Sequence, residues 1–273
     1  MENSENNINN NLSFKEKIVK LWSSFTTYEK IWFFSVVILT IIVSIIWPST
    51  VDNLSINPIL IMTLYIADVF SNALCELLIS KQSKWNFIVS LFVEVIEIAT
   101  LIVIAERFAS MAVTLFFWIP IDIISFINWN KHKDEKEEEI TKVRTLKGWQ
   151  EILIIFGIIV WTFGVGYILT LIDVEGILDA NETIDKIVCY LDAFVSAVGV
   201  CNGLFILFRF REQWIAWYID AILETIINIL SGQWVLLVLK AAYFTNTTYG
   251  YIKWTKYIKS HPDEIEIEKK SFF

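Results

Sequence analysis

The middle of the chain, from Ile152 to Ile172, reads Ile-Leu-Ile-Ile-Phe-Gly-Ile-Ile-Val-Trp-Thr-Phe-Gly-Val-Gly-Tyr-Ile-Leu-Thr-Leu-Ile, which is 21 consecutive residues without a charged side chain. As an α-helix this stretch would be about 31 Å long. That length matches the hydrocarbon layer of a bilayer, which is roughly 30 Å thick. Because lipid offers no hydrogen-bond partners, the backbone inside it must form helices or closed barrels. The stretch therefore predicts a transmembrane helix.

The rest of the 273-residue chain has the composition of a protein that crosses the membrane several times. Hydrophobic residues make up 55% of it and charged residues only 19%, whereas an average soluble domain has roughly 25% charged residues. The formal net charge is −8, and there is no basic run of the kind that binds phosphates. We therefore expect the lipid bilayer, and not nucleic acid, as its environment.

Residue types that carry enzymatic chemistry form no recognisable site. Cys75, Cys189 and Cys201 lie in apolar segments, and His132 and His261 lie far from them in polar segments. Such an arrangement provides neither a zinc site nor a disulfide framework. A Gly-rich phosphate loop and a nucleophile elbow are also missing from the sequence. We expect no enzyme, no metal, no cofactor and no catalytic residue.

Eight apolar stretches of helical length follow one another along the chain. They are Ile31–Trp47, Ile59–Ile79, Trp85–Ala105, Phe108–Trp129, Trp149–Ile172, Ile187–Phe208, Trp214–Leu230 and Trp234–Trp254. Hydropathy therefore predicts an all-α membrane bundle of about eight transmembrane helices.

Lys and Arg residues mark one side of this predicted bundle. They precede the first stretch and follow the second, fourth, sixth and eighth stretches, which all end on the same side of the membrane. Loops rich in Lys and Arg stay in the cytoplasm. Both termini are thus expected in the cytoplasm, with tails at 1–30 and 257–273 and a loop at 130–148.

Two patterns recur at an offset of 125 residues. Tyr65-Ile-Ala-Asp68 recurs as Tyr190-Leu-Asp-Ala193, and Phe126-Ile-Asn-Trp-Asn-Lys131 recurs as Tyr251-Ile-Lys-Trp-Thr-Lys256. Equivalent helices are four spans apart, so the repeats have the same orientation in the membrane. The expected domains are an extra N-terminal helix at 31–48, a three-helix bundle at 59–129, a linker helix at 149–172 and a second three-helix bundle at 187–256.

Ionisable side chains inside the predicted helices cost about 3 kcal/mol each at mid-membrane, so they usually face a cavity or a partner. The predicted helices contain many carboxylates: Asp68, Glu76, Glu94, Glu97, Asp122, Asp192, Asp220 and Glu224. The main cation among them is Lys240. Such an excess of negative charge around a cavity suits a cationic solute.

Aromatic and acidic residues share one face on two of the predicted helices, at steps of three or four residues. Trp faces would stack on a flat cationic ring, with roughly 0.5–2 kcal/mol from each cation–π contact. Carboxylates and amides would then fix the polar edges of the ring. The predicted substrate-binding residues are Trp118, Asp122, Asn202, Trp217, Asp220, Glu224 and Asn246.

Other roles for these residue types stay open. Trp residues at helix ends commonly anchor a protein at the membrane interface. Glu94 and Glu97 can either pair with Lys240 or hold a proton in a hydrogen bond between helices. Asp68 can serve helix capping or packing. Pro120 removes a backbone hydrogen bond and is expected to kink its helix.

Three motifs follow one another in the second half: Tyr190-Leu-Asp-Ala193, Arg211-Glu-Gln-Trp-Ile-Ala-Trp217 and Tyr249-Gly-Tyr-Ile-Lys-Trp254. In that order they resemble the PnuC family of bacterial vitamin transporters. The first half agrees, because Phe116-Phe-Trp-Ile-Pro120 begins an aromatic helix that ends in Trp129. The resemblance covers residues from about 30 to about 257.

This resemblance implies a SWEET-like arrangement of two parallel three-helix bundles in a bacterial plasma membrane, with the substrate bound between them. It also implies facilitated diffusion of nicotinamide riboside, a precursor of NAD, or of a related cationic vitamin, and trapping of the product by a separate cytoplasmic kinase. Carriers of nicotinamide riboside resemble one another in the neutral Gln or Asn amides that line the site. At the corresponding places this chain has Asp122, and Ala221 beside Asp220. Thiamine is therefore the alternative substrate.

Three further questions stay open from the sequence. The bundles can function within one chain or in a homotrimer. Transport can be coupled to protons through Glu94, Glu97 and Glu224. A membrane protein that transports nothing, such as an immunity or scaffold protein, is the remaining function class.

Overall fold

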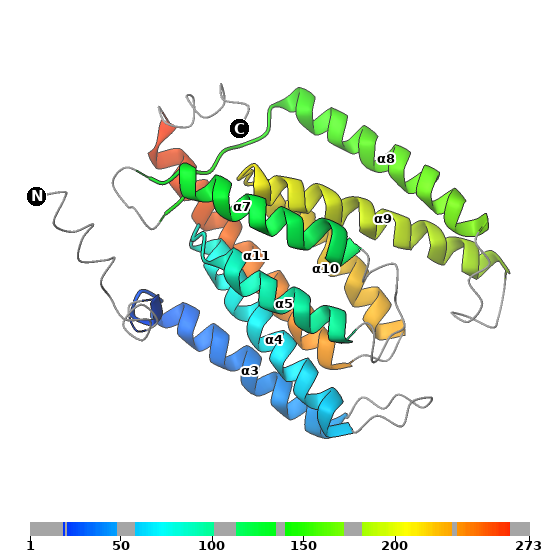
Figure 1. Cartoon of the computed structure of the whole chain (residues 1–273), viewed down its shortest axis with the longest axis horizontal. Helices are drawn as coiled ribbons and strands as arrows, with labels where there is room; N and C mark the ends of the chain where they lie inside the picture. The colour runs from blue at the N-terminus through cyan, green and yellow to red at the C-terminus, as the bar shows by residue number, and fades with distance from the viewer. Residues whose placement is uncertain are drawn as a thin grey trace, which may run out of the picture.

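The computed structural model describes Val19 and residues 21–47, 58–100, 113–134, 140–171, 182–230 and 234–262. They form α3 (Thr27–Ile46), α4 (Pro58–Ser80), α5 (Asn86–Thr100), η2 (Thr114–Trp118), α7 (Ile119–Lys131), α8 (Gly148–Leu171), α9 (Glu182–Leu207), α10 (Gln213–Leu230) and α11 (Trp234–Ser260). The π-helical turn η2 continues directly into α7. The helices run lengthwise in one bundle, with α3 and α8 at opposite edges (Figure 1).

The described residues of the eight predicted stretches are helical except for the end residues Trp47, Trp85 and Phe208, and the described residues contain no strand beyond two isolated bridges. The predicted all-α fold is thus confirmed. Several boundaries differ from the predicted ones, since α3 begins at Thr27 and not at Ile31, α9 begins at Glu182 and not at Ile187, and α11 ends at Ser260 and not at Trp254. Thr26 and Glu29 form a reciprocal capping box, with backbone-to-side-chain distances of 3.2 and 2.7 Å, which satisfies two free N–H groups at the helix start.

Helix contacts divide the bundle into two three-helix units with the same internal arrangement. In the first unit α5 contacts both α4 and α7, and in the second unit α10 contacts both α9 and α11. The units meet where α4 packs on α11 and where α7 packs on α9. A two-fold axis between parallel repeats produces this exchange, because it maps α4 onto α9 and α7 onto α11. The same map pairs α3, which packs on α4, with α8, which packs on α9.

The C-terminal ends of α4 and α9 close with the same hydrogen-bond pattern. Gln82 and Arg209 have φ angles of 58° and 61°. Their N–H groups donate to the carbonyl oxygens of Ile79 and Ile206, at 2.8 and 3.0 Å, and the next N–H group completes a Schellman motif in each case. The two helix ends are therefore equivalent at an offset of 127 residues, two more than the offset at which Tyr65 recurs as Tyr190 in the sequence.

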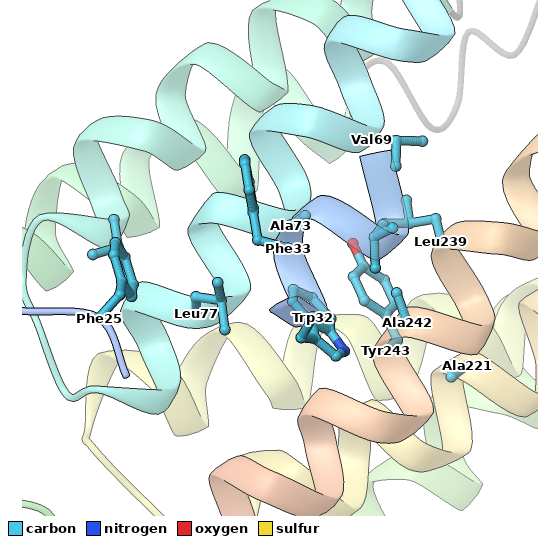
Figure 2. Close-up of a cluster of buried hydrophobic side chains, with 12 residues drawn as sticks. Phe25, Trp32, Phe33, Val69, Ala73, Leu77, Ala221, Leu239, Ala242 and Tyr243 are labelled. Atoms are coloured by element: carbon cyan, nitrogen blue, oxygen red, sulfur yellow. The ribbon is translucent and has the colours of Figure 1, made fainter. Parts of the chain in front are cut away.

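A cluster of buried hydrophobic side chains joins α3, α4 and α11 (Figure 2). Trp32 and Phe33 of α3 pack there against Leu77 of α4 and Tyr243 of α11. Trp32 also donates from Nε1 to the hydroxyl of Thr245 on α11, at 2.8 Å. The N-terminal helix is thus a packed part of the bundle and holds α4 against α11.

Three of the described helices are long and apolar enough to cross a membrane by length and composition alone. They are Thr27–Ile46, Ile59–Ser80 and Gly148–Ile168, with mean hydropathies of 2.1, 1.5 and 2.1. In α8 only 6% of this window is buried inside the protein, and large side chains such as Phe163 face outward. Lipid tails can cover that face at no desolvation cost. Helices α7, α9 and α11 contain buried polar side chains such as Asp122, Asn202 and Asn246, and this lowers the mean hydropathy of these three helices.

Candidate substrate site

The indole of Trp217 on α10 is fixed by an amide of α9. Asn202 is buried, and its Oδ1 accepts a hydrogen bond from Trp217 Nε1 at 3.2 Å while its Nδ2 donates to the carbonyl oxygen of Gln213 at 3.2 Å. The Trp217 ring lies 5.3 Å from the ring of Tyr243 on α11, centroid to centroid. Helices α9, α10 and α11 therefore present two aromatic rings, one of them held by an amide.

A chain of hydrogen bonds leads from Tyr243 into the first unit. Its hydroxyl donates to Asn72 Oδ1 on α4 at 2.8 Å. The Nδ2 group of Asn72 then donates to Asp68 Oδ1 at 2.9 Å. Because Tyr243 and Asp68 are both buried, this polar chain lies inside the protein, across the interface between the units.

A second polar contact crosses the same interface one turn further along. Asn246 of α11 donates from Nδ2 to Glu76 Oε2 and to the Glu76 carbonyl oxygen of α4, both at 3.0 Å. Both side chains are buried, and Asn246 Oδ1 has no hydrogen-bond partner among the described residues. A buried acceptor without a partner costs about 1–3 kcal/mol, so this amide oxygen is available to a ligand donor.

Lys240 of α11 is the counter-ion of carboxyl groups from two helices, α10 and α4. Its Nζ lies 3.7 Å from Glu224 Oε2 on α10. It also lies close enough to attract the carboxylates of Asp220 on α10 and of Asp68 and Glu76 on α4. Four acidic groups thus share one lysine, so carboxyl groups outnumber cationic groups among the described residues at this point of the bundle.

The ring of Trp118 packs against α9, where two glycines leave space for it. A Cβ atom added at Gly199 would lie 3.9 Å from the Trp118 ring, and one added at Gly203 would lie 3.3 Å from it and 2.8 Å from the Phe117 ring. These rings belong to η2, and Pro120 follows directly at the start of α7. Since proline disturbs the regular helix, the π-helical turn accompanies the distortion expected there.

Asp122 of α7 faces α5. Its buried carboxyl group lies within hydrogen-bonding reach of Ser90 and Glu94. Glu94 is buried as well, and one oxygen of each carboxyl group, Asp122 Oδ2 and Glu94 Oε2, has no partner among the described residues. Of the two roles left open for Glu94, the structure favours a hydrogen bond between helices, since Glu94 lies against Asp122 and Lys240 pairs with Glu224.

The structure brings most of the predicted site residues toward one region. Asn202 contacts Trp217, Asp220 and Glu224 lie near Lys240, and Trp118 packs on Gly199 and Gly203 of α9. Asp122 lies apart from them, against α5. The sequence prediction did not include four residues: Asn72, Glu76, Lys240 and Tyr243. Glu76 and Lys240 were visible as charges inside helices, but nothing in their spacing connected them to the site.

The two units differ at equivalent positions of this interface. With α4 and α9 aligned at an offset of 127 residues, Asn72 and Glu76 correspond to Gly199 and Gly203. The α4 side chains bind Tyr243 and Asn246, whereas the α9 glycines leave space for Trp118. One side of the interface is therefore polar and acidic and the other aromatic, which is an arrangement that can hold an amphipathic ring compound.

Comparison with known proteins agrees with this geometry. A family model described as nicotinamide mononucleotide transporter matches residues 61–256, from α4 to α11. The chain belongs to this family. The nicotinamide riboside transporters PnuC of Neisseria mucosa and Haemophilus influenzae are 25% and 28% identical to it, over 201 and 195 residues. These regions cover 69% of this chain in both cases, and 70% and 77% of the two relatives.

A crystal structure of the vitamin B3 transporter PnuC has the same fold. It superposes with a TM-score of 0.69 at 22% identity and covers 92% of this chain and 100% of its own. The resemblance inferred from the sequence motifs is thus confirmed. The protein is a multi-pass membrane transporter for a small molecule and not an enzyme.

Proposed function

We propose that this protein carries a cationic, ring-containing vitamin by facilitated diffusion, with nicotinamide riboside as the first candidate and thiamine as the second. The names of the two relatives support the first candidate. The charge balance around Lys240 carries the proposal, because four carboxylates share this lysine. In a low-dielectric interior, a cationic substrate would offset the remaining negative charge.

The substrate would lie between the two units, with its ring against aromatic side chains. Trp217 and Tyr243 form one aromatic wall, and the Trp118 ring of η2 lies against Gly199 and Gly203 of α9. Asn246 Oδ1 is free to accept a donor from the ring substituent. Asp220 and Glu224 would then neutralise the positive charge of the ring.

The choice between the two vitamins depends on which protein groups face the polar edge of the substrate ring. Ala221 stands next to Asp220 on α10 and is fully buried, so no amide projects from that position. Carboxyl groups such as Asp220 and Glu76 can pair with the aminopyrimidine edge of thiamine, and they can equally balance the pyridinium charge of nicotinamide riboside. Both substrates therefore stay in the proposal.

We propose further that both termini lie in the cytoplasm of a bacterial cell and that a cytoplasmic kinase traps the product by phosphorylation. The Lys and Arg residues of the loops support this orientation. The two units, at 59–129 and 187–256, would rock about the site as in a SWEET-like carrier, with α8 as the linker. One chain contains both units, so a monomer suffices for transport, and a homotrimer would be an assembly of complete carriers.

Uptake into proteoliposomes tests this proposal. Vesicles containing the purified protein should take up radiolabelled nicotinamide riboside or thiamine saturably, and the inside and outside concentrations should become equal. Vesicles that also contain ATP and a nicotinamide riboside kinase should accumulate the label further. Uridine, a neutral nucleoside, serves as the control for the role of positive charge. Lack of saturable uptake of both vitamins would refute the substrate assignment.

Proton-coupled transport is the second candidate, and the contact between Asp122 and Glu94 favours it. Two ionised carboxylates are acceptors only, so a hydrogen bond between these groups requires a proton on one of them. Glu97 lies near Glu94 on the same helix, and Cys75 approaches from α4. A proton held at this place could enter and leave as α5 and α7 move.

A pH gradient distinguishes the two candidates. Under coupling, an imposed gradient should drive uptake beyond equal concentrations, a protonophore should abolish this excess, and Glu94→Gln should remove it as well. Under facilitated diffusion, the final concentrations inside and outside stay equal with or without the gradient.

A further inference from the structure

Two buried tryptophans connect the two units at one end of the bundle. Trp129, near the end of α7, donates from Nε1 to the carbonyl oxygen of Ile206 in α9, at 2.8 Å. Trp254 of α11 donates in the same way to the carbonyl oxygen of Ile79 in α4, at 3.2 Å. Both indoles are fully buried, and their rings lie 5.9 Å apart. This is the end of the bundle at which α4, α7, α9 and α11 terminate and the connection from α7 to α8 begins. We call it the linker end.

The two bonds are equivalent under the repeat. Trp129 and Trp254 occupy the same position at an offset of 125 residues, and Ile79 and Ile206 do so at an offset of 127. Each bond starts in one unit and ends in the other. If the units move apart at the linker end, both bonds therefore break in the same movement, and neither indole can remain bonded while the other separates.

A short segment between α7 and α8, which we call the strap (Thr141–Arg144), bridges the same two helix ends. The N–H of Thr141 donates to the carbonyl oxygen of Gln82 after α4, at 3.1 Å, and that of Arg144 donates to the carbonyl oxygen of Arg209 after α9, at 2.9 Å. Three residues of chain span at most about 11 Å. While both bonds hold, the strap therefore limits how far the units separate.

The two attachments of the strap differ in strength. Arg144 also donates from Nε to the carbonyl oxygen of Phe208 at 2.8 Å, and its guanidinium lies 4.5 Å from the centroid of the Phe210 ring. Its carbonyl oxygen accepts from the N–H of Arg211 at 2.8 Å. The attachment to the end of α9 thus has several contacts. In the first unit, the strap is held to the end of α7 by Lys142 N–H to the carbonyl oxygen of His132 at 2.9 Å and by the Thr141 hydroxyl to that of Trp129 at 3.4 Å. Only the bond from Thr141 to Gln82 reaches the end of α4, so this bond should release first.

We propose that Trp129 and Trp254 form the gate at the linker end, closed in this structure, and that the strap sets the limit of its opening. This inference rests on the proposed transport function, in which the linker end faces the cytoplasm. A buried indole N–H usually has an acceptor or water as its partner. The gate opens when water replaces the two carbonyl acceptors, and the path from the site to the cytoplasm then passes between the indoles.

Labelling of an introduced cysteine tests the gate without any substrate. Ser125 is fully buried on α7, one turn before Trp129. Ser125→Cys, in a chain whose three native cysteines are replaced by serine, would be exposed to a membrane-impermeant maleimide from the linker-end side. Trp129→Phe or Trp254→Phe should each raise the labelling rate about fivefold, the ratio that one ordinary hydrogen bond gives, and the double variant about 25-fold.

Trp214→Phe is the matched control. Trp214 is also fully buried and packs on Trp254 with ring centroids 5.6 Å apart, but its Nε1 has no hydrogen-bond partner among the described residues. This variant removes the same ring volume without removing a bond between the units, so labelling should stay at the parent rate. A rise equal to that of Trp129→Phe, or an equal rise from both membrane sides, would overturn the gate.

The strap has its own pair of variants. Thr141→Pro removes the N–H donor to Gln82 and should raise labelling of the introduced cysteine, whereas Thr141→Ser keeps that donor and the hydroxyl that donates to the carbonyl oxygen of Trp129, and should not. Equal labelling in both variants would remove the strap from the proposal. Since labelling requires no substrate, failure of vitamin uptake with the expected labelling pattern would contradict the proposed function and leave the gate intact.

Discussion

The hydroxyl of Tyr243 on α11 donates a hydrogen bond to Asn72 on α4, across the interface between the two units. Tyr243→Phe keeps the ring against Trp217 but leaves the amide oxygen without this donor. We expect the Kd for the transported vitamin to rise about fivefold, as for the loss of one net hydrogen bond. Titration calorimetry measures it. Tyr218→Phe is the control, because the Tyr218 hydroxyl contacts Thr248 within the second unit, and equal losses in both variants would contradict a specific role.

The carboxylate of Glu224 should contribute to binding through its charge. Glu224→Gln keeps the size of the side chain and removes one of the four negative charges that share Lys240. We expect the Kd for a cationic vitamin to rise roughly tenfold, since a partly buried charge pair gains more than 1 kcal/mol. Glu151→Gln, at an exposed position of α8, is the matched control and should leave the Kd unchanged. An unaltered Kd for Glu224→Gln would remove the electrostatic argument.

Helices and topology were accessible from the sequence because their signals are local or repeated. An uncharged run of membrane length is sufficient for a helix such as α8, and the recurrence of Trp129 as Trp254 indicated the two units. The structure supplies the physical reason for that recurrence, since each indole bonds to a helix of the other unit. Repetition in sequence here reflects one interaction made twice.

Contacts at the candidate site were less accessible because they depend on how α4 and α11 lie against each other. Glu76 and Asn246 are 170 residues apart, and no period within either helix records that they meet. Asn202 and Trp217 were predicted, since both lie on polar stripes of neighbouring helices. The start of α3 was misplaced because its capping residues, Thr26 and Glu29, are polar and fall outside the apolar run.

Glu29 should contribute to the stability of the folded protein and not to transport. It is fully buried and accepts hydrogen bonds from Tyr249 at 2.9 Å and from Lys253 at 3.2 Å, which attach α3 to α11. We expect Glu29→Gln to lower the free energy of unfolding by about 2 kcal/mol, the value of a hydrogen bond to a charged group. Thermal unfolding in detergent measures this loss.

Vitamin uptake by the same variant shows whether α3 also acts in transport. The family match begins at residue 61, after α3, so uptake per folded molecule should stay at the parent level. Lys256→Gln, which changes an exposed charge on α11, is the control for both measurements. Loss of uptake at unchanged stability would assign α3 a part in the transport cycle.

Gly203 on α9 should tolerate no side chain. A Cβ atom there would lie 2.8 Å from the Phe117 ring and 3.3 Å from the Trp118 ring, so both rings must move and the contact between α7 and α9 must widen. Overpacking of this kind costs about 1–3 kcal/mol, which exceeds the gain of up to about 1 kcal/mol from replacing a helical glycine by alanine. Gly203→Ala should therefore unfold at lower temperature and bind the vitamin more weakly.

Two other glycines separate this effect from helix propensity. Gly157 on α8 has no atom within 4 Å of an added Cβ, so Gly157→Ala should raise the free energy of unfolding by about 0.5–1 kcal/mol. Gly199 would meet the Trp118 ring at 3.9 Å, which is an ordinary contact, and Gly199→Ala should leave binding within about twofold. If Gly203→Ala were as stable as Gly157→Ala and bound the vitamin as tightly as the parent, the close approach of Trp118 to α9 would have no part in forming the site.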